Sequence, residues 1–179
     1  MKYTTLLALT SLLASGSVLA DIKGHRIGAG FNNTKIEDAL YGDDYKVSGL
    51  KLEYGYEFSP IVGINVSYTK GKETFYEYFE SDTSALKIDA DIGYTFQLDN
   101  HITLKPYAAV GLARFNEKLN ALSYPIHSWS DNALFIGFGT RATFAEHFYA
   151  DLRLDYMNLD DDGYDIFVDQ FSLTFGYKF

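Results

Sequence analysis

The chain has 179 residues, 17% of them aromatic, and a formal net charge of −9 at pH 7. This acidic balance argues against nucleic acid and against an anionic membrane surface as partners, because both repel a negatively charged protein. Cysteine is absent, which excludes disulfides and thiolate chemistry.

The first segment, MKYTTLLALTSLLASGSVLA, has the organisation of a secretory signal peptide. Lys2 supplies a positive charge, an apolar stretch follows, and Val18 and Ala20 suit the positions before a cleavage site. The apolar stretch is too short to span a bilayer as a helix. We therefore expect residues 1–20 to be removed and residues 21–179 to form one domain, which has no cysteine to carry a lipid anchor.

After this segment, large apolar residues repeatedly alternate with small or polar ones. Successive side chains of a strand point to opposite faces, so the alternation predicts strands with one apolar face. The clearest example closes the chain, where every second residue of FSLTFGYKF is large and apolar. The segments with this pattern are residues 24–32, 47–58, 61–70, 85–98, 102–113, 133–144, 148–157 and 167–179.

The connections between these predicted strands alternate in length. The short ones are 59–60, 99–101 and 145–147, and the long ones are 33–45, 71–84, 116–131 and 158–165. An even number of strands of about ten residues, with short turns at one end and long loops at the other, is typical of bacterial outer-membrane barrels. We predict an all-β fold, an eight-stranded antiparallel transmembrane β-barrel in an up-and-down meander, with its last strand paired to its first, after a cleaved signal peptide.

A soluble barrel has its apolar face inside, whereas a membrane barrel has it outside, and the polar face distinguishes the two. That face carries six cations and six anions: Arg26, Lys51, Glu53, Glu57, Lys87, Asp89, Asp91, Lys105, Arg141, Asp151, Arg153 and Asp155. It also carries the strand glycines, namely Gly28, Gly30, Gly49, Gly55, Gly63, Gly93, Gly111, Gly137, Gly139 and Gly176. Long charged side chains beside glycines suit a narrow, charge-balanced lumen, whereas glycine on a solvent face only weakens a strand. The apolar face is therefore predicted to contact lipid.

Aromatic residues near the strand ends are predicted to form the two interfacial girdles. The periplasmic set is Tyr56, Phe58, Phe96, Phe144, Phe148, Tyr177 and Phe179, and the outer set is Tyr68, Tyr76, Tyr156 and Phe167. Three further aromatics, Tyr107, Phe135 and Tyr149, lie on the polar face, where we expect them to fill the lumen. Pro106 cannot donate to a strand ladder, so we expect a bulge near it.

These segments resemble the small outer-membrane β-barrels of the OmpA transmembrane-domain, OmpX/Ail and opacity-protein type. The resemblance covers the whole chain after residue 20 and is carried by KPYAAVGLA, FIGFGTRATF, YADLRLDYM and FSLTFGYKF. It implies a monomer in the outer membrane of a Gram-negative bacterium, in contact with outer-membrane lipid and lipopolysaccharide. It also implies that the last strand, ending in Phe179, is read by the barrel-assembly machinery. The roles of this family lie in variable loops, so the resemblance predicts fold more sharply than function.

No residue pattern predicts catalysis, a cofactor or a metal site. The four histidines, His25, His101, His127 and His147, are not spaced for metal ligation. The stretch IHSWSDN brings His127 near two serines and Asp131, but a polar loop is the commoner setting for such residues. We therefore predict no catalytic, cofactor-binding or metal-binding residues and no enzyme activity. A lipid-A-modifying enzyme is the least favoured alternative.

Two predicted loops leave alternatives open. NLDDDGYDIFVD, residues 158–169, matches most of a calcium-loop spacing, but strands flank it and the final glutamate is missing, so a solvated acidic turn is favoured. GKETFYEYFESDTS, residues 71–84, either extends two strands as a ribbon with exposed edges or supplies an outer aromatic girdle.

From these features we predict a structural or surface-interaction role, similar to adhesion or serum resistance, in which extracellular loops bind a host or surface protein. The alternative is a small porin-like channel for ions or solutes. The balanced charges of the predicted lumen argue for a closed interior and against that channel.

Overall fold

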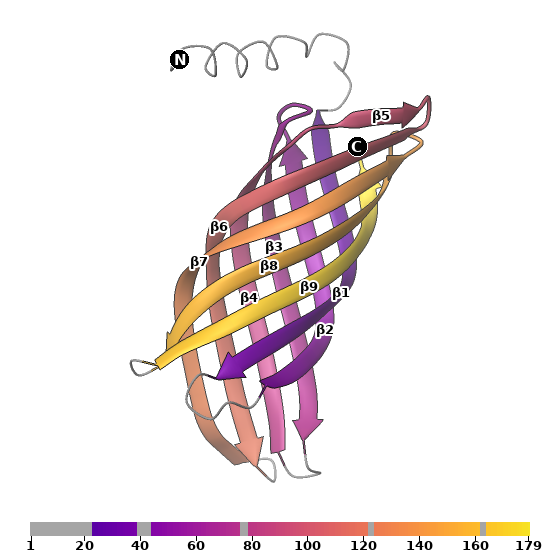
Figure 1. Ribbon diagram of the computed structural model, residues 1–179. Helices are drawn as coiled ribbons and strands as arrows, with labels where there is room; N and C mark the ends of the chain where they lie inside the picture. The colour runs from indigo at the N-terminus through magenta and orange to yellow at the C-terminus, as the bar shows by residue number, and fades with distance from the viewer. Residues whose placement is uncertain (1–22, 39–43, 76–78, 122–123, 162–163) are drawn as a thin grey trace, which may run out of the picture.

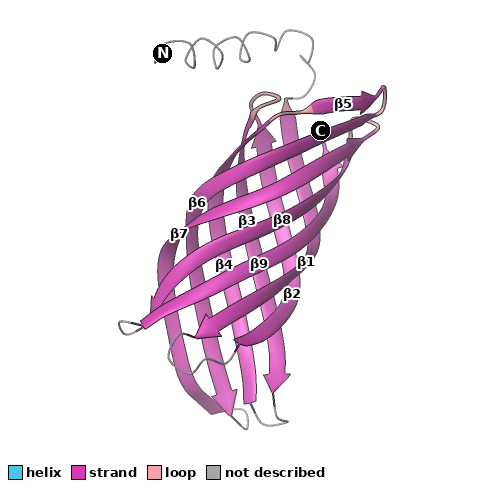
Figure 2. Cartoon of the chain, in the orientation of Figure 1, coloured by secondary structure: helices cyan, strands magenta, loops and turns pink. Residues whose placement is uncertain are grey.

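A computed structural model describes residues 23–38, 44–75, 79–121, 124–161 and 164–179. These residues form strands and no helix (Figure 2). The strands are β1 (Gly24–Asp38), β2 (Asp44–Glu57), β3 (Val62–Phe75), β4 (Phe79–Gly93), β5 (Phe96–Asp99), β6 (Ile102–Ala121), β7 (Tyr124–Phe144), β8 (Phe148–Asp161) and β9 (Tyr164–Lys178). No described helix is long and apolar enough to cross a bilayer, a finding that does not bear on crossing by strands. The expected signal segment, residues 1–20, lies outside the described residues.

The strands close into an antiparallel barrel, as predicted. Consecutive strands pair with each other except β4 and β5, and β1 also pairs with β9 and β4 with β6. Strand β5 continues β4 along the same edge of β6, because Gly93 opposite Tyr107 and Phe96 opposite Leu104 belong to one unshifted register. The barrel therefore has eight strand positions. Pro106 lies opposite the break between β4 and β5, where its carbonyl accepts from the Tyr94 N–H at 3.2 Å. The irregularity expected near it occurs at the start of β6, as a register shift between Gln97 and Asp99.

The register fixes the stagger of the barrel. The paired residues followed once around it are Arg26, Gly55, Asn65, Asp89, Gly111, Phe135, Met157, Val168 and Ile36. The path leaves β1 at Arg26 and returns to β1 at Ile36, ten residues nearer the outer end. Such a stagger requires strands tilted by roughly 35–45° to the barrel axis.

The two faces of the wall have the predicted polarity. Outward-facing side chains such as Leu52 and Ile92 are 60% and 58% exposed in the isolated chain. All twelve charged residues predicted for the lumen are buried, with Arg26 only 1% exposed. Tyr107, Phe135 and Tyr149 are buried in the lumen as well. The apolar face therefore lies outside and the charged face inside.

The strands extend further outward than the sequence pattern indicated. The regions predicted as long loops, 33–45, 71–84, 116–131 and 158–165, are mostly paired strand. Figure 1 shows the outer ends of β3, β4, β6 and β7 at the bottom of the view, beyond the β1–β2 and β8–β9 hairpins. We call these outer ends, residues 72–75, 79–84, 116–121 and 124–134, the protruding sheet.

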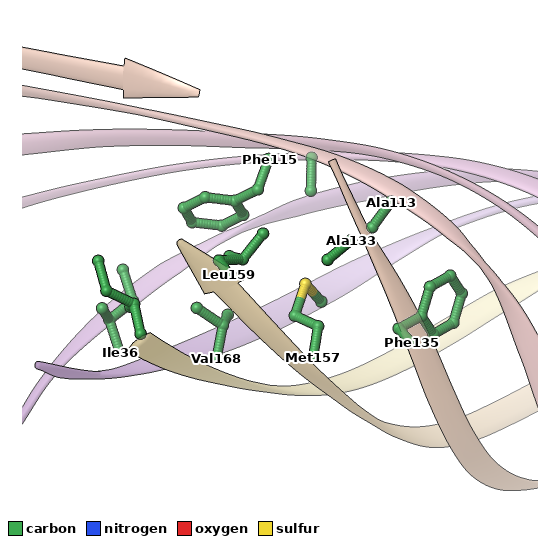
Figure 3. Packing of buried hydrophobic residues seen from close by; sticks show 10 residues of the cluster. Ile36, Ala113, Phe115, Ala133, Phe135, Met157, Leu159 and Val168 are labelled. Carbon is green, nitrogen blue, oxygen red and sulfur yellow. The ribbon is translucent and has the colours of Figure 1, made fainter. Parts of the chain in front are cut away.

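An apolar cluster fills the outer half of the lumen, and of its members only Phe135 was predicted to lie there (Figure 3). Its members are Ile36, Ala85, Ala113, Phe115, Ala133, Phe135, Met157, Leu159, Ile166 and Val168. These residues continue the two-residue period on the lumen face, whereas the sequence prediction followed the apolar residues of the lipid face. That change of face is why the segments of Ile36 and Leu159 were taken for loops, whereas most other members of the cluster lie in predicted strands.

Candidate functional site

The periplasmic half of the lumen holds an ion-pair cluster centred on two carboxylates. Lys105 Nζ lies 2.7 Å from Glu57 Oε2 and 2.6 Å from Asp91 Oδ1. Arg26 Nη1 lies 2.5 Å from Glu57 Oε1, and Arg141 also pairs with Glu57. These five residues are on β1, β2, β4, β6 and β7, so one cluster ties together much of the barrel circumference.

A second ion-pair cluster lies nearer the middle of the lumen. Lys87 Nζ is 2.5 Å from Asp155 Oδ2, and Arg153 Nε is 2.6 Å from Asp155 Oδ1. Asn65 joins the two clusters: its Nδ2 donates to Asp89 Oδ1 at 2.7 Å and its Oδ1 accepts from Arg26. Because buried charges are stable only when paired, the joined clusters hold the lumen closed.

Phe135 forms the boundary between the charged and apolar parts of the lumen. Lys87 Nζ lies 5.2 Å and the Arg153 guanidinium carbon 5.5 Å from the centre of its ring. Cation–π attraction therefore anchors the ring beneath the apolar cluster. Beyond it, Phe115 is fully buried and packs against Trp129 with ring centres 5.4 Å apart. The lumen is thus blocked twice, by ion pairs and then by apolar side chains.

A buried carboxylate caps the apolar cluster at the outer mouth. Glu117 is 1% exposed and accepts hydrogen bonds from three neutral donors. Tyr45 Oη donates at 2.7 Å, Ser81 Oγ at 2.6 Å and Trp129 Nε1 at 3.1 Å. These donors come from β2, β4 and β7, so the hydrogen bonds fix the inner face of the protruding sheet against the β1–β2 hairpin. This group was not predicted from the sequence, because its members lay in predicted loops.

The protruding sheet has an open edge, meaning an edge with no neighbouring strand. Strand β7 pairs with β8 only from Phe135 to Phe144, so in the described structure residues 124–134 pair with β6 alone. Residues 71–84 were predicted to form a ribbon with exposed edges. Within this ribbon, β4 pairs with β6 along its whole length, so its edge is not open. The exposed edge expected there is therefore limited to β3 beyond Gly71, and the longer open edge belongs to β7.

The aromatic girdle at the periplasmic rim is confirmed. Phe148 packs edge-on against Tyr177, with ring centres 5.5 Å apart. His25 stacks on Phe179, and the backbones of these two residues exchange hydrogen bonds of 3.0 and 2.9 Å at the seam between β1 and β9. In the outer girdle, Tyr68, Tyr156 and Phe167 are exposed, whereas Tyr76 lies outside the described residues.

The other residues singled out from the sequence are not assembled into a catalytic or metal site in the described residues. His25, His101 and His147 are at the periplasmic end, far along the barrel from His127, which is exposed on β7. Residues 158–161 pair with residues 164–167 as antiparallel strands, with Asn158 opposite Phe167, which differs from a calcium loop. Asp162 and Gly163 lie outside the described residues. No group of three potential metal ligands occurs in the described ranges.

The comparison with protein families agrees with this architecture. Residues 4–179 match the model of the outer membrane protein beta-barrel domain. The chain belongs to this outer-membrane β-barrel family. It is therefore a protein of the bacterial outer membrane, and its apolar wall faces lipid.

Two relatives place the chain more closely within the family. The attachment invasion locus protein of Yersinia pseudotuberculosis is 26% identical over 175 residues, which covers 93% of this chain and 90% of that protein. The crystal structure of Ail from Yersinia pestis, in complex with the heparin analogue sucrose octasulfate, has a TM-score of 0.64 at 24% identity and covers 88% of this chain and 99% of that chain.

The fold is shared with a more distant surface protein. Neisserial surface protein A has a TM-score of 0.66 at 18% identity, with 87% of this chain and 97% of that chain covered. At such low identity the likeness supports the barrel fold and leaves the role of the outer residues to be argued from this chain.

Proposed function

We propose that this barrel is a surface-interaction protein whose protruding sheet binds a partner protein by strand addition. The observation that carries the proposal is the open edge of β7 above a lumen closed by two barriers. An open strand edge presents backbone donors and acceptors that another chain can pair with. The related attachment invasion locus protein carries in its name a role in attachment, and we extend an adhesion or serum-resistance role to this chain.

The register indicates which backbone groups a partner would meet. At the base of the β6–β7 ladder, the Ala145 N–H donates to the His101 carbonyl at 2.8 Å. Hydrogen-bonded pairs alternate along an antiparallel ladder, so the odd-numbered residues of β7 bond to β6. The backbone groups of Ser128 and Ser130 are accordingly directed to the open edge, whereas the Asn132 N–H already donates to Asp131 Oδ1 at 2.7 Å.

A proline on this edge tests the proposal. Ser130→Pro removes one outward N–H and leaves the pairing with β6 intact. Cells that express the variant should adhere to matrix-coated surfaces about tenfold less, the effect of losing roughly one well-placed backbone hydrogen bond. Ser130→Ala, which keeps the N–H, is the matched control. Equal adhesion by the proline variant, at equal surface expression, would contradict strand addition.

A second test uses the outer hairpin of β3 and β4. Shortening this hairpin by excising residues 72–82 removes its protruding part and leaves the membrane-embedded ladder in place. Adhesion and survival in serum should both fall if the protruding sheet is the contact surface. Unchanged adhesion and survival would mean either that β7 alone makes the contact or that the protein has no surface-interaction role.

The remaining parts of the proposal concern assembly and lipid contacts. Residues 1–20 act as the export signal, the strand ending in Phe179 is read by the barrel-assembly machinery, and the protein works as a monomer. Phe179→Ser should lower the yield of assembled barrel, whereas Ser48→Ala, on the outward face of β2, should not.

Lys70 and Arg114 are exposed and point outward. Each follows an apolar outward residue of its strand, Tyr68 or Leu112, so these two cations suit contact with lipopolysaccharide phosphates.

We propose that the protein is neither an enzyme nor an open channel. The supporting observation against conduction is the pair of lumen barriers in series. The channel alternative predicts steady conductance of the wild-type protein in planar bilayers. Catalytic modification of lipid A predicts altered lipid A on overexpression, and calcium binding at residues 158–169 predicts heat on calorimetric titration with calcium.

A further inference from the structure

The lipid-facing wall contains a groove of about 660 Å³ that crosses β7, β8, β9, β1 and β2. Its lining is apolar and includes Ala29, Ala150, Phe148 and Tyr177. The groove exists because Phe175 is flanked by alanines: it pairs with Ala150 on one side and with Ala29 on the other. Neighbouring outward positions carry large side chains, so the alanines leave a depression whose size is typical of small-molecule sites, about 300–1,000 Å³.

The groove rises from the periplasmic rim toward the middle of the membrane. Phe144, Phe148, Tyr177 and Ile27 are successive partners along one row across the wall. A row of partners followed from β7 through β8, β9 and β1 to β2 moves toward the outer end of the barrel. One full turn in this direction shifts the position on β1 outward by ten residues. With strands about 4.8 Å apart and tilted by about 40°, the steps from β7 to β2 climb roughly 12 Å. That is about half of the apolar band, roughly 25 Å tall, of such barrels.

Polar groups that accept hydrogen bonds occur at the periplasmic end of the groove. The turn between β7 and β8 contains Glu146 and His147, both exposed. The His147 ring stacks on Tyr177 with centres 5.3 Å apart, and its Nδ1 donates to the Lys178 carbonyl at 3.1 Å. The second nitrogen of the neutral ring is then an acceptor, so it and the Glu146 carboxylate can both meet an ammonium group.

We propose that the groove binds one zwitterionic aminophospholipid of the periplasmic leaflet. One acyl chain lies along the groove over Ala150 and Ala29, and the headgroup contacts His147 and Glu146. The occupant is a lipid because the groove opens only to the membrane and runs from the interface into the hydrocarbon. The bound chain would cover the seam at which β9 and β1 close the barrel.

Native mass spectrometry of the full-length folded protein tests this assignment. The wild type, released from detergent micelles that contain phosphatidylethanolamine, should retain one lipid, and it should retain phosphatidylglycerol less well. The double variant Ala29→Leu/Ala150→Leu fills the groove, and its apparent affinity should fall at least about tenfold. Ala90→Leu/Ala108→Leu is the matched control, because both alanines also face lipid, on β4 and β6.

Equal retention of lipid by the two double variants would overturn the site. The proposal would also be overturned if the wild type showed a dimer mass that the groove variant lacked. A second copy of the chain would then occupy the groove. Glu146→Gln, which leaves the groove unchanged, should reduce the preference for phosphatidylethanolamine over phosphatidylglycerol. An unchanged preference would contradict the headgroup assignment even if the groove variant failed to fold.

Discussion

At the scale of single residues, the lumen places several carboxylates where two or more cations share them. Glu57 meets Arg26, Lys105 and Arg141, and Asp155 meets Lys87 and Arg153. The glycines give these long side chains room: a Cβ added at Gly55 would lie 2.5 Å from the Arg26 Cζ. The alternation of charge and glycine was readable in the sequence, but the individual pairs were not, because they depend on the register.

Removing one shared carboxylate should be costly. Glu57→Ala leaves three buried cations with fewer partners, so we expect the free energy of unfolding to fall by about 3–5 kcal/mol. Denaturant unfolding in micelles measures this. The control is Glu80→Ala, because Glu80 pairs at 2.6 Å with the exposed Lys72 outside the membrane. A loss no larger for Glu57 than for Glu80 would contradict the buried network.

The Lys72–Glu80 pair also has a defined pH dependence. The hydrogen bond to Glu80 raises the pKa of Lys72 above its ordinary value of 10.5. A raised pKa means that the small contribution of the pair is complete at neutral pH and is lost as the pH rises through the raised pKa. Between pH 6 and 9, the Glu80 control should therefore differ from the wild type by a constant amount.

A side chain at a lumen glycine should disrupt the packing. Gly55→Val places a branched side chain against the Arg26 guanidinium and should destabilise the barrel by about 1–3 kcal/mol. Thermal unfolding followed by circular dichroism would detect the change. Ser48→Val, on the outward face of the same strand, is the control. Similar midpoints for the two variants would mean that the lumen is wider than the structure indicates.

At the scale of elements, the membrane-embedded parts of the strands were predictable and their outer extensions were not. Within the membrane, the medium forces large apolar side chains onto one face, so the two-residue period is strong. Beyond it, residues such as Ile36 and Val168 place their apolar side chains in the lumen, and the outward face becomes polar. A prediction based on the apolar residues of the outward face therefore ends each strand too early. Hairpin pairing and the Glu117 hydrogen bonds then decide how far the strands continue.

Hydrogen exchange should reveal the change along β7. Amides of Ser128 and Ser130 face the open edge, whereas those of Ile136 and Phe138 lie where β8 pairs with β7. Unpaired strand amides open at low free energy, so the first set should exchange at least about tenfold faster. Exchange resolved by residue in micelles measures the difference. Equal protection of both sets would mean that another segment covers the edge.

At the scale of the whole molecule, the barrel combines a lipid-facing wall, two lumen barriers in series and a protruding sheet. Because the barriers are in series, either one alone should prevent conduction. We expect no steady conductance in planar bilayers from the wild type, from Glu57→Ala, or from Phe115→Ala/Phe135→Ala. Only the combination should conduct measurably. Steady conductance of the wild type would contradict the closed lumen and favour the channel alternative.

The central claim is that the apolar face of the wall lies against lipid. The chain has no native cysteine, so single cysteines at Leu52, Ile92 and Ser130 can carry nitroxide labels without background. In bilayers, the labels at Leu52 and Ile92 should be relaxed strongly by oxygen and weakly by a water-soluble nickel complex, and the label at Ser130 should show the reverse. Strong relaxation of the Leu52 and Ile92 labels by the nickel complex would contradict the account.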